Sequence, residues 1–259
     1  LGRGWLAYLL YDFYGPITIA DLQTLKDPMA EKIRPRLSEE EMQTYIETEL
    51  TEASKILPAN YKKGDKNYGR FTAGLAHTVL LKLYMLTKQW DKAEAEGREL
   101  MKPEYGFELV PEYKDIFTLA NEKNPEIIWA CQCAKGYQEH KWQPHVLPND
   151  YNFTPYLDKM TKWNGYKISW SFMHTFDPED KRLLTIASEY TSKDGVVHNE
   201  KNDSQDPSAQ LYLGAVPLKY EFDPDCTGED SQIDWIIYRY ADVLTLTAEA
   251  IVRKNSGRN

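Results

Sequence analysis

Two apolar helical patterns separated by only two residues constrain the fold of this chain more than any other feature. The first pattern covers about residues 70–87 and the second about residues 90–101. Only Lys88 and Gln89 lie between them, and so short a connection forces two helices to pack antiparallel. The sequence therefore predicts a helical hairpin at the centre of the fold.

Two further helical patterns precede the hairpin. Apolar residues recur at helical spacing over residues 5–13, and a glycine-proline pair ends that run. The next pattern begins with the spacing of a capping box, in which Ser38 and Glu41 each accept a hydrogen bond from the other residue's backbone N–H. Pro58 ends this second pattern. We expect one helix over each segment.

The hairpin also carries part of a repeat consensus. The stretch KQWDKA followed by EAEGREL resembles the turn and second helix of a tetratricopeptide repeat. Leu80, Tyr84 and Ala93 fill positions of that consensus. His77 and Gly97 depart from it, because a large aromatic side chain is usual at both positions.

The pattern changes in the second half of the chain. EIIWACQC at 126–133 is short, apolar and β-branched, which favours a strand. Between 137 and 176, ten of forty residues are aromatic, against 13% for the whole chain. Asp177-Pro178 is typical of a helix start, and 190–234 is polar and rich in turns. We expect aromatic-bearing loops here, with regular helix returning at 238–250, YRYADVLTLTAEA.

Charge and cysteine content exclude several classes of protein. A formal net charge of -9 repels phosphate backbones, and no basic stripe is present, so nucleic acid is not an expected partner. Cys131, Cys133 and Cys226 are too few for a disulfide framework. No apolar run approaches the roughly 18 to 20 residues that span a bilayer. Since the chain begins at Leu1, we expect a longer precursor whose targeting signal is not visible here.

Two carboxylates on the last helical pattern could suggest catalysis. Asp242 and Glu249 are seven residues apart, or about 10.5 Å along a helix axis. That separation exceeds the roughly 6.5 to 9.5 Å of an inverting glycosidase pair. Arg239 stands three residues before Asp242 and can pair with it. With no motif of a known hydrolase or nucleotide-binding loop, we expect no catalytic residue.

The spacing of cysteines and histidines does not favour a metal site. Cys131, Cys133, His140 and His145 are close in sequence, but their spacing matches no zinc finger. In a strand the two cysteines face the same side, where small buried thiols are common. Loops such as Asn202-Asp203 could hold calcium or nothing. We expect no metal ligand and no cofactor.

Five elements occur in this order along the chain: GRFTAGLAHTVLLKLYMLTKQWDKA, YGFELVPEYKDIF, NEKNPEIIWA, FDPEDKR and YRYADVLTLTAEA. Together they resemble the SusD/RagB family of outer-membrane nutrient-binding lipoproteins, over essentially the whole chain. Members are usually much longer, and the lipidated N-terminal cysteine, first helices and closing C-terminal region have no counterpart here. Ligand residues in those parts cannot be assigned.

The resemblance implies a mainly α-helical fold in a single SusD-like domain over residues 1–259. Tetratricopeptide-like antiparallel helix pairs would form a right-handed superhelix, with an irregular, loop-rich region containing a few short strands. The helical scaffold would cover about 1–125 and 236–259. The loop-rich region at about 126–235 would hold the ligand.

The resemblance also implies a function. Such a protein captures an oligosaccharide at the cell surface without catalysis and passes it to a SusC-like TonB-dependent transporter in the outer membrane. A lipid anchor absent from this chain would attach the full-length protein to that membrane.

The expected ligand contacts are aromatic, because sugar rings stack their C–H faces on Trp and Tyr while nearby polar groups bond the hydroxyls. Tyr137, Trp142 and Tyr151 are the first candidates, with Gln138, Gln143, Asn149 and Asp150 close in sequence. Trp163 and Tyr166 are secondary candidates, since the resemblance places them, with Trp170, nearer the scaffold. Each aromatic could instead pack a loop onto the helices.

Three rival functions remain open. A peptide-binding, RagB-like member of the same family predicts fewer stacked aromatics and more charge over residues 137–176. An all-helical glycoside hydrolase predicts a convergent carboxylate pair in a cleft. A repeat scaffold that binds only proteins leaves the aromatic loop region unexplained.

Overall fold

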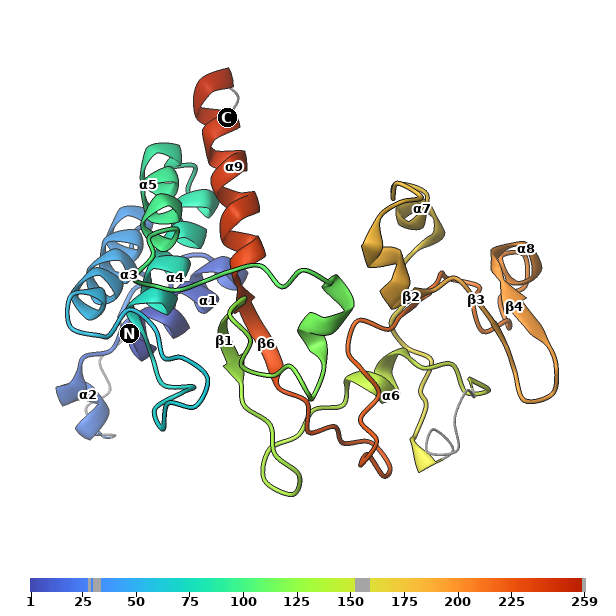
Figure 1. Cartoon of the computed structure of the whole chain (residues 1–259). Helices are drawn as coiled ribbons and strands as arrows, with labels where there is room; N and C mark the ends of the chain where they lie inside the picture. Colours follow the sequence, from blue (N-terminus) through green and yellow to red (C-terminus); the bar gives the residue numbers. More distant parts are fainter. Residues whose placement is uncertain (28, 30–33, 152–158, 258–259) are drawn as a thin grey trace. The chain divides into compact units, whose positions relative to one another are not determined.

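The computed structural model describes residues 1–27, 29, 34–151 and 159–257, in which the chain forms two compact units (Figure 1). The first unit contains Leu1–Leu109, Pro125–Trp129 and Tyr238–Asn259. The second unit contains Val110–Asn124 and Ala130–Ile237. Each unit therefore joins segments that are distant in sequence.

Helices build the first unit, and the predicted capping box is present. Ser38 Oγ accepts a hydrogen bond from the Glu41 N–H at 3.2 Å, and the Ser38 N–H donates to Glu41 Oε2 at 2.8 Å. Backbone groups at the start of this helix are thereby satisfied. The helices are α1 (Gly2–Tyr14), α2 (Leu22–Lys26), α3 (Glu39–Ser54), α4 (Ala73–Leu86), α5 (Trp90–Leu100) and α9 (Tyr240–Ser256).

The predicted hairpin is formed by α4 and α5, and α4 is the centre of the unit. It packs against α1, α3, α5 and α9, which explains why its sequence is apolar on almost every face. The turn is closed by the Gln89 N–H, which donates to Tyr84 O at 2.8 Å. The right-handed superhelix stays a prediction.

Gly97 departs from the repeat consensus because α9 packs directly against α5 at this residue. A Cβ atom on Gly97 would lie only 2.8 Å from Thr247 Cβ, and Thr247 is buried. The aromatic side chain usual at this position would not fit. The close approach of α9, a segment about 150 residues away, requires glycine here.

The expected start of the last helix is wrong by two residues, and the difference changes the partner of Arg239. Tyr238 and Arg239 belong to strand β6 (Trp235–Arg239), which pairs with β1 (Ile127–Cys131). Arg239 has extended φ and ψ angles of -139° and 157°, so the helical geometry assumed for a pair with Asp242 does not exist.

Arg239 instead pairs with Glu126. Its Nη1 donates to Glu126 Oε1 at 2.6 Å, and the Glu126 side chain is only 1% exposed. The Tyr240 N–H donates to Glu126 O at 2.8 Å. Both the side chain and the backbone of Glu126 therefore hold the start of α9.

Short elements make up most of the second unit. β2 pairs with β5 and β3 pairs with β4, both antiparallel. These elements are η1 (Tyr113–Phe117), α6 (Trp142–Val146), α7 (Trp170–Met173), η3 (Lys181–Thr185), β2 (Ile186–Ala187), β3 (Glu189–Thr191), β4 (Val197–Asn199), α8 (Glu200–Asp203) and β5 (Val216–Pro217).

The helix start predicted at Asp177-Pro178 is wrong. Asp177 lies in a turn, where its Oδ1 accepts a hydrogen bond from the Glu179 N–H at 2.8 Å. The helix that follows is the 3₁₀ helix η3, and Asp180 caps it by accepting from the Arg182 N–H at 2.9 Å. The N-cap is therefore Asp180, three residues after the predicted Asp177.

A polar cluster fixes part of the second unit. His198 Nδ1 lies 2.8 Å from Asp203 Oδ2, and His198 Nε2 lies 3.0 Å from Asp150 Oδ2. The Tyr190 hydroxyl donates to Asp150 Oδ1 at 2.6 Å, and its ring stacks on His198. Asp203 also accepts from the Leu211 N–H. Because the helices of the second unit are short, side-chain hydrogen bonds of this kind keep its loops in one conformation.

Loss of the Arg239 guanidinium should destabilise the chain strongly. We expect Arg239→Gln to lower the free energy of unfolding by roughly 3 kcal/mol, because a buried carboxylate loses its charged partner. Urea unfolding followed by circular dichroism measures this loss. The matched control is Arg253→Gln, which removes an exposed pair with Glu249 and a cation–π contact with Trp90 and should cost no more than about 1 kcal/mol.

Adding Glu126→Gln to Arg239→Gln should recover part of the loss, since no charge is then buried. Equal losses in Arg239→Gln and Arg253→Gln would contradict the central role given to this pair.

Gly97→Ala should destabilise the first unit although alanine favours helices. The new Cβ would meet the side chain of Thr247, and such overpacking costs about 1 to 3 kcal/mol. Thermal and urea unfolding measure the effect, and Thr247→Ala in the same chain should restore part of it. A more stable Gly97→Ala variant, as helix propensity alone predicts, would refute the close contact.

Candidate functional site

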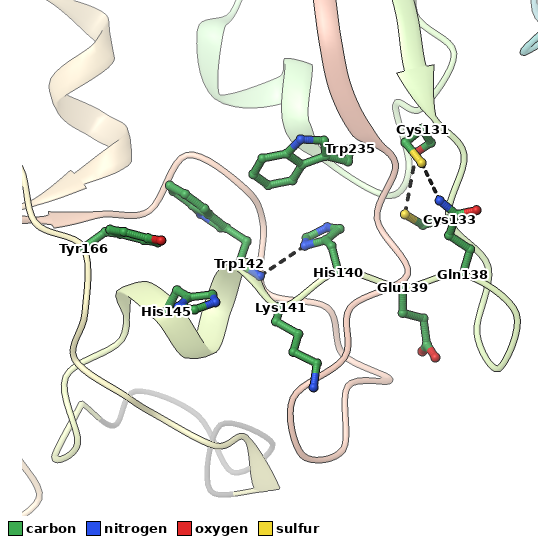
Figure 2. Close-up of a pocket in the computed structure, with 10 residues that line it drawn as sticks. All are labelled: Cys131, Cys133, Gln138, Glu139, His140, Lys141, Trp142, His145, Tyr166 and Trp235. Atoms are coloured by element: carbon green, nitrogen blue, oxygen red, sulfur yellow. Dashed lines mark hydrogen bonds between the residues drawn. The ribbon is translucent and has the colours of Figure 1, made fainter. Parts of the chain in front are cut away.

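A cleft of about 410 Å³ in the second unit brings together aromatic side chains from three separate segments (Figure 2). The first segment runs from the end of β1 through α6, the second is the loop that contains Tyr166, and the third contributes Trp235 from β6. The residues that line the cleft are Cys131, Cys133, Gln138, Glu139, His140, Lys141, Trp142, His145, Tyr166 and Trp235.

His140 fixes the start of α6 and thereby the position of Trp142. His140 Nε2 lies 2.9 Å from Ile233 O, and because a carbonyl only accepts, Nε2 carries the proton. His140 Nδ1 then accepts the Trp142 N–H at 3.2 Å. Burial lowers the pKa of His140, so the neutral ring that these two bonds require is favoured at neutral pH.

The loop at 163–166 closes onto α6 and places Tyr166 against Trp142. The Gly165 and Tyr166 N–H groups both donate to His145 O at 2.8 Å. A Cβ atom on residue 165 would lie 2.8 Å from the same oxygen, so glycine permits this approach. The Tyr166 ring consequently stacks on Trp142, with ring centroids 6.4 Å apart and planes inclined by 20°.

Trp235 forms a second aromatic wall. Its ring centroid lies 5.6 Å from that of Trp142 and 5.1 Å from that of His140. Behind it, Tyr220 stacks on Trp235 at 5.0 Å with an interplanar angle of 9°. Trp142 and Trp235 both pack on the buried cluster of Ile116, Phe117, Tyr220 and Ile233. The walls are therefore rigid, and an incoming ring would find them already in place.

The polar side chains at the cleft are engaged in contacts of their own. Lys141 Nζ pairs with Glu229 Oε2 at 2.6 Å, and Glu139 Oε2 accepts from the Gly136 N–H at 3.1 Å. Gln138 donates to the Cys131 sulfur. A ligand would thus meet mainly aromatic surface, with exposed groups such as Lys141 and Gln138 able to bond its hydroxyls.

The four residues weighed for zinc all line this cleft, but they do not form a metal site. Both ring nitrogens of His140 are already bonded within the protein. Among the described residues, no group of three or more His, Cys, Asp or Glu side chains could hold a metal ion. Burial also raises the pKa of the Cys133 thiol to about 11, which disfavours the thiolate that zinc requires.

The five predicted ligand residues have different environments. Trp142 and Tyr166 line the cleft, and the Trp163 ring meets His145 edge-on at 4.7 Å. Tyr137 is 94% exposed and does not line it. Tyr151 is 3% exposed and packs against Tyr190, so its ring belongs to the core. Residues 152–158 of the predicted aromatic segment lie outside the described residues.

The polar neighbours expected to bond sugar hydroxyls serve largely to support the fold. Gln143 is buried and donates to Glu221 O at 2.8 Å. Asp150 accepts the Tyr190 hydroxyl and contacts His198. The Asn149 backbone N–H donates to Gln210 Oε1, while Asn149 itself is exposed and does not line the cleft. Of the four, Gln138 lines the cleft.

Sequence reasoning missed Trp235, His140 and His145 as cleft residues. Trp235 lies about 90 residues beyond Trp142, and no local pattern links them. The sequence pattern connects the two histidines only with a possible metal site, although an aromatic-rich neighbourhood also suits their flat rings.

No family model matches the chain. A curated relative, the SusD-like protein of Bacteroides ovatus, is 25% identical over an alignment of 272 residues, which covers 99% of this chain and 48% of the relative. The chain thus spans about half the length of that relative.

Solved structures share the fold. A SusD-like protein from Bacteroides fragilis has a TM-score of 0.74 at 22% identity, covering 98% of this chain and 56% of that one. For a SusD superfamily protein from Parabacteroides distasonis these values are 0.75, 19%, 98% and 54%. For surface glycan-binding protein A from Bacteroides uniformis they are 0.71, 20%, 97% and 53%.

The raised pKa of the Cys133 thiol predicts slow alkylation. At pH 8 iodoacetamide should label Cys133 far more slowly in the folded chain than in the chain unfolded in urea, because the thiolate is the nucleophile. The rate in the folded chain should climb as the pH approaches 11. Peptide mapping by mass spectrometry follows the site, and equal rates in both states at pH 8 would argue against a raised pKa of this thiol.

Proposed function

Because this chain is SusD-like in sequence over 99% of its length and in its fold, we propose that it binds glycans without catalysis. The observation that carries the proposal is the cleft walled by Trp142, Tyr166 and Trp235. Three aromatic rings around one cleft offer the flat apolar surfaces on which sugar rings stack.

The dimensions and the chemistry of the cleft suit an oligosaccharide. A volume of about 410 Å³ falls in the range of small-molecule sites and accommodates a few sugar rings. Tyr166 is 60% exposed, so a longer chain could continue past it into solvent. Solved structures with this fold include surface glycan-binding proteins, which supports the same class of ligand.

Binding rather than hydrolysis fits the charges at the cleft. Among the described residues, Glu139 is the one carboxylate that lines it, whereas glycoside hydrolysis needs a pair about 5 to 10 Å apart. On α9, Glu249 pairs with Arg253 at 2.7 Å, as expected of a surface helix residue.

The similarity to SusD-like proteins supports a proposal for the setting of the whole protein. We place it at the cell surface, associated with the outer membrane through a lipid anchor, where it passes captured oligosaccharide to a SusC-like TonB-dependent transporter. None of the described helices is long and apolar enough to cross a bilayer.

Removal of the stacked ring should abolish most binding. We expect Tyr166→Ala and Trp142→Ala each to weaken the best ligand of a neutral glycan panel at least about tenfold, measured by titration calorimetry. Tyr166 is the cleaner test because its ring is largely exposed, whereas Trp142 also packs on the core. Thermal unfolding verifies that each variant is folded.

Tyr137→Ala is the matched control, since this exposed ring lies outside the cleft and its loss should leave the affinity unchanged. If no glycan binds and peptides bind tightly, the peptide-binding hypothesis replaces the proposal of glycan binding. Hydrolysis that persists through purification and disappears in Glu139→Gln would make the protein an enzyme.

A further inference from the structure

The first unit has an aromatic cavity of its own, which the proposed glycan cleft does not explain. It measures about 620 Å³ and lies near the loop that leads into α4. Its lining combines three aromatic rings with one cationic side chain. The lining residues are Leu57, Tyr61, Gly69, Arg70, Phe71 and Trp129.

The aromatic wall of this cavity is held in place by neighbours. The Trp129 indole N–H donates to Gly69 O at 3.3 Å, and Trp5 meets the Trp129 ring edge-on at 4.7 Å. Trp5 is in turn fixed by its N–H, which donates to the Tyr238 hydroxyl at 3.1 Å. The Phe71 ring lies 5.7 Å from Trp129 and is 36% exposed. Such a wall can receive a ring with little reorganisation.

The cation at this wall lacks an internal partner. Arg70 is exposed, and across residues 1–27, 29, 34–151 and 159–257 no carboxylate forms an ion pair with it. By contrast, Arg3, Arg98, Arg182 and Arg253 all form ion pairs. The guanidinium of Arg70 is therefore available to a ligand, and its planar fork fits a carboxylate or sulfate with two parallel hydrogen bonds.

The loop around Arg70 is cationic in an otherwise acidic chain. Residues 61–70, YKKGDKNYGR, carry four cationic side chains and one carboxylate, a net charge of +3, while the whole chain carries -9. Asp65, the one carboxylate, accepts hydrogen bonds from the backbone and side chain of Asn67. Consecutive backbone bonds from Asp65 N to Lys62 O, and from Arg70 N to Asn67 O, keep the loop folded. A local positive field of this kind attracts anions.

We propose that this cavity binds an acidic sugar, a pyranose ring that carries a carboxylate or a sulfate ester. The ring would lie on Phe71 and Trp129, and its anionic group would bond the Arg70 guanidinium. A uronate suits this arrangement best, because its carboxylate is planar and attached directly to the ring. The site stands independently of the cleft at Trp142, where Lys141, the lysine among the described lining residues, already pairs with Glu229.

Titration calorimetry on the 259-residue chain tests the proposal with trigalacturonate and its carboxyl-reduced counterpart. We expect the acidic trimer to bind and the reduced trimer to bind at least about tenfold more weakly. Arg70→Gln and Phe71→Ala should each weaken the acidic trimer to a similar degree. A sulfated galactose trimer should bind with the same dependence on Arg70, which would support the shared anionic chemistry.

Lys63→Gln is the matched control, since it removes an equal charge from the same loop at an exposed residue that does not line the cavity. Its effect should stay below about threefold. Equal losses in Lys63→Gln and Arg70→Gln would overturn the proposal in favour of diffuse charge attraction, as would equal binding of the reduced trimer.

Two further outcomes separate this site from its alternatives. Tyr166→Ala should leave trigalacturonate binding intact. If this variant no longer binds trigalacturonate, the ligand binds in the cleft of the second unit and the proposal for the Arg70 cavity is overturned. Peptides ending in an aromatic residue that bind through Arg70 more tightly than any acidic sugar would overturn the sugar assignment. Failure of neutral glycans to bind the Trp142 cleft would leave the Arg70 result unaffected, so the two proposals fail separately.

Discussion

The buried ion pair between Arg239 and Glu126 is the interaction on which the first unit depends. A carboxylate that is 1% exposed is costly to bury, and its pairing with a guanidinium at 2.6 Å makes that burial tolerable. The two residues are 113 positions apart, so the pair also selects one arrangement of the chain. Glu126 precedes β1, and Arg239 ends β6 where α9 begins. Once these ends meet, α9 can pack on α5, and this packing requires glycine at position 97.

The second unit is organised by a different physical principle. Its helices and strands are short, and backbone hydrogen bonds between loops replace long helix contacts. His145 O accepts from two successive N–H groups of the 163–166 loop, and His140 bonds both Ile233 O and the Trp142 N–H. These bonds place aromatic rings from three segments around one cleft. Loops held by such bonds can carry a binding surface that a regular helix face would not provide.

The elements with strong local signals could be predicted from sequence. The capping box at Ser38 and Glu41 and the short connection between α4 and α5 were both found where expected. Errors occurred where two local signals competed. Asp180 rather than Asp177 caps the following helix, and Tyr238-Arg239 forms a strand end although the residues after it are strongly helical. At such positions the contacts of a distant segment, or a second capping residue, decide the outcome.

The sequence alone determined the helical hairpin, the aromatic enrichment of the second half and the resemblance to SusD-like proteins, because periodicity, capping and motif order are local properties of a chain. Only the tertiary structure decided which aromatic rings share a cleft. Trp142 meets Tyr166 and Trp235, while Tyr151 enters the core and Tyr137 remains in solvent. The residue types are the same, and their neighbours in sequence are equally polar. Their roles differ because long-range hydrogen bonds and close backbone approaches, which no local pattern encodes, set the direction of each ring.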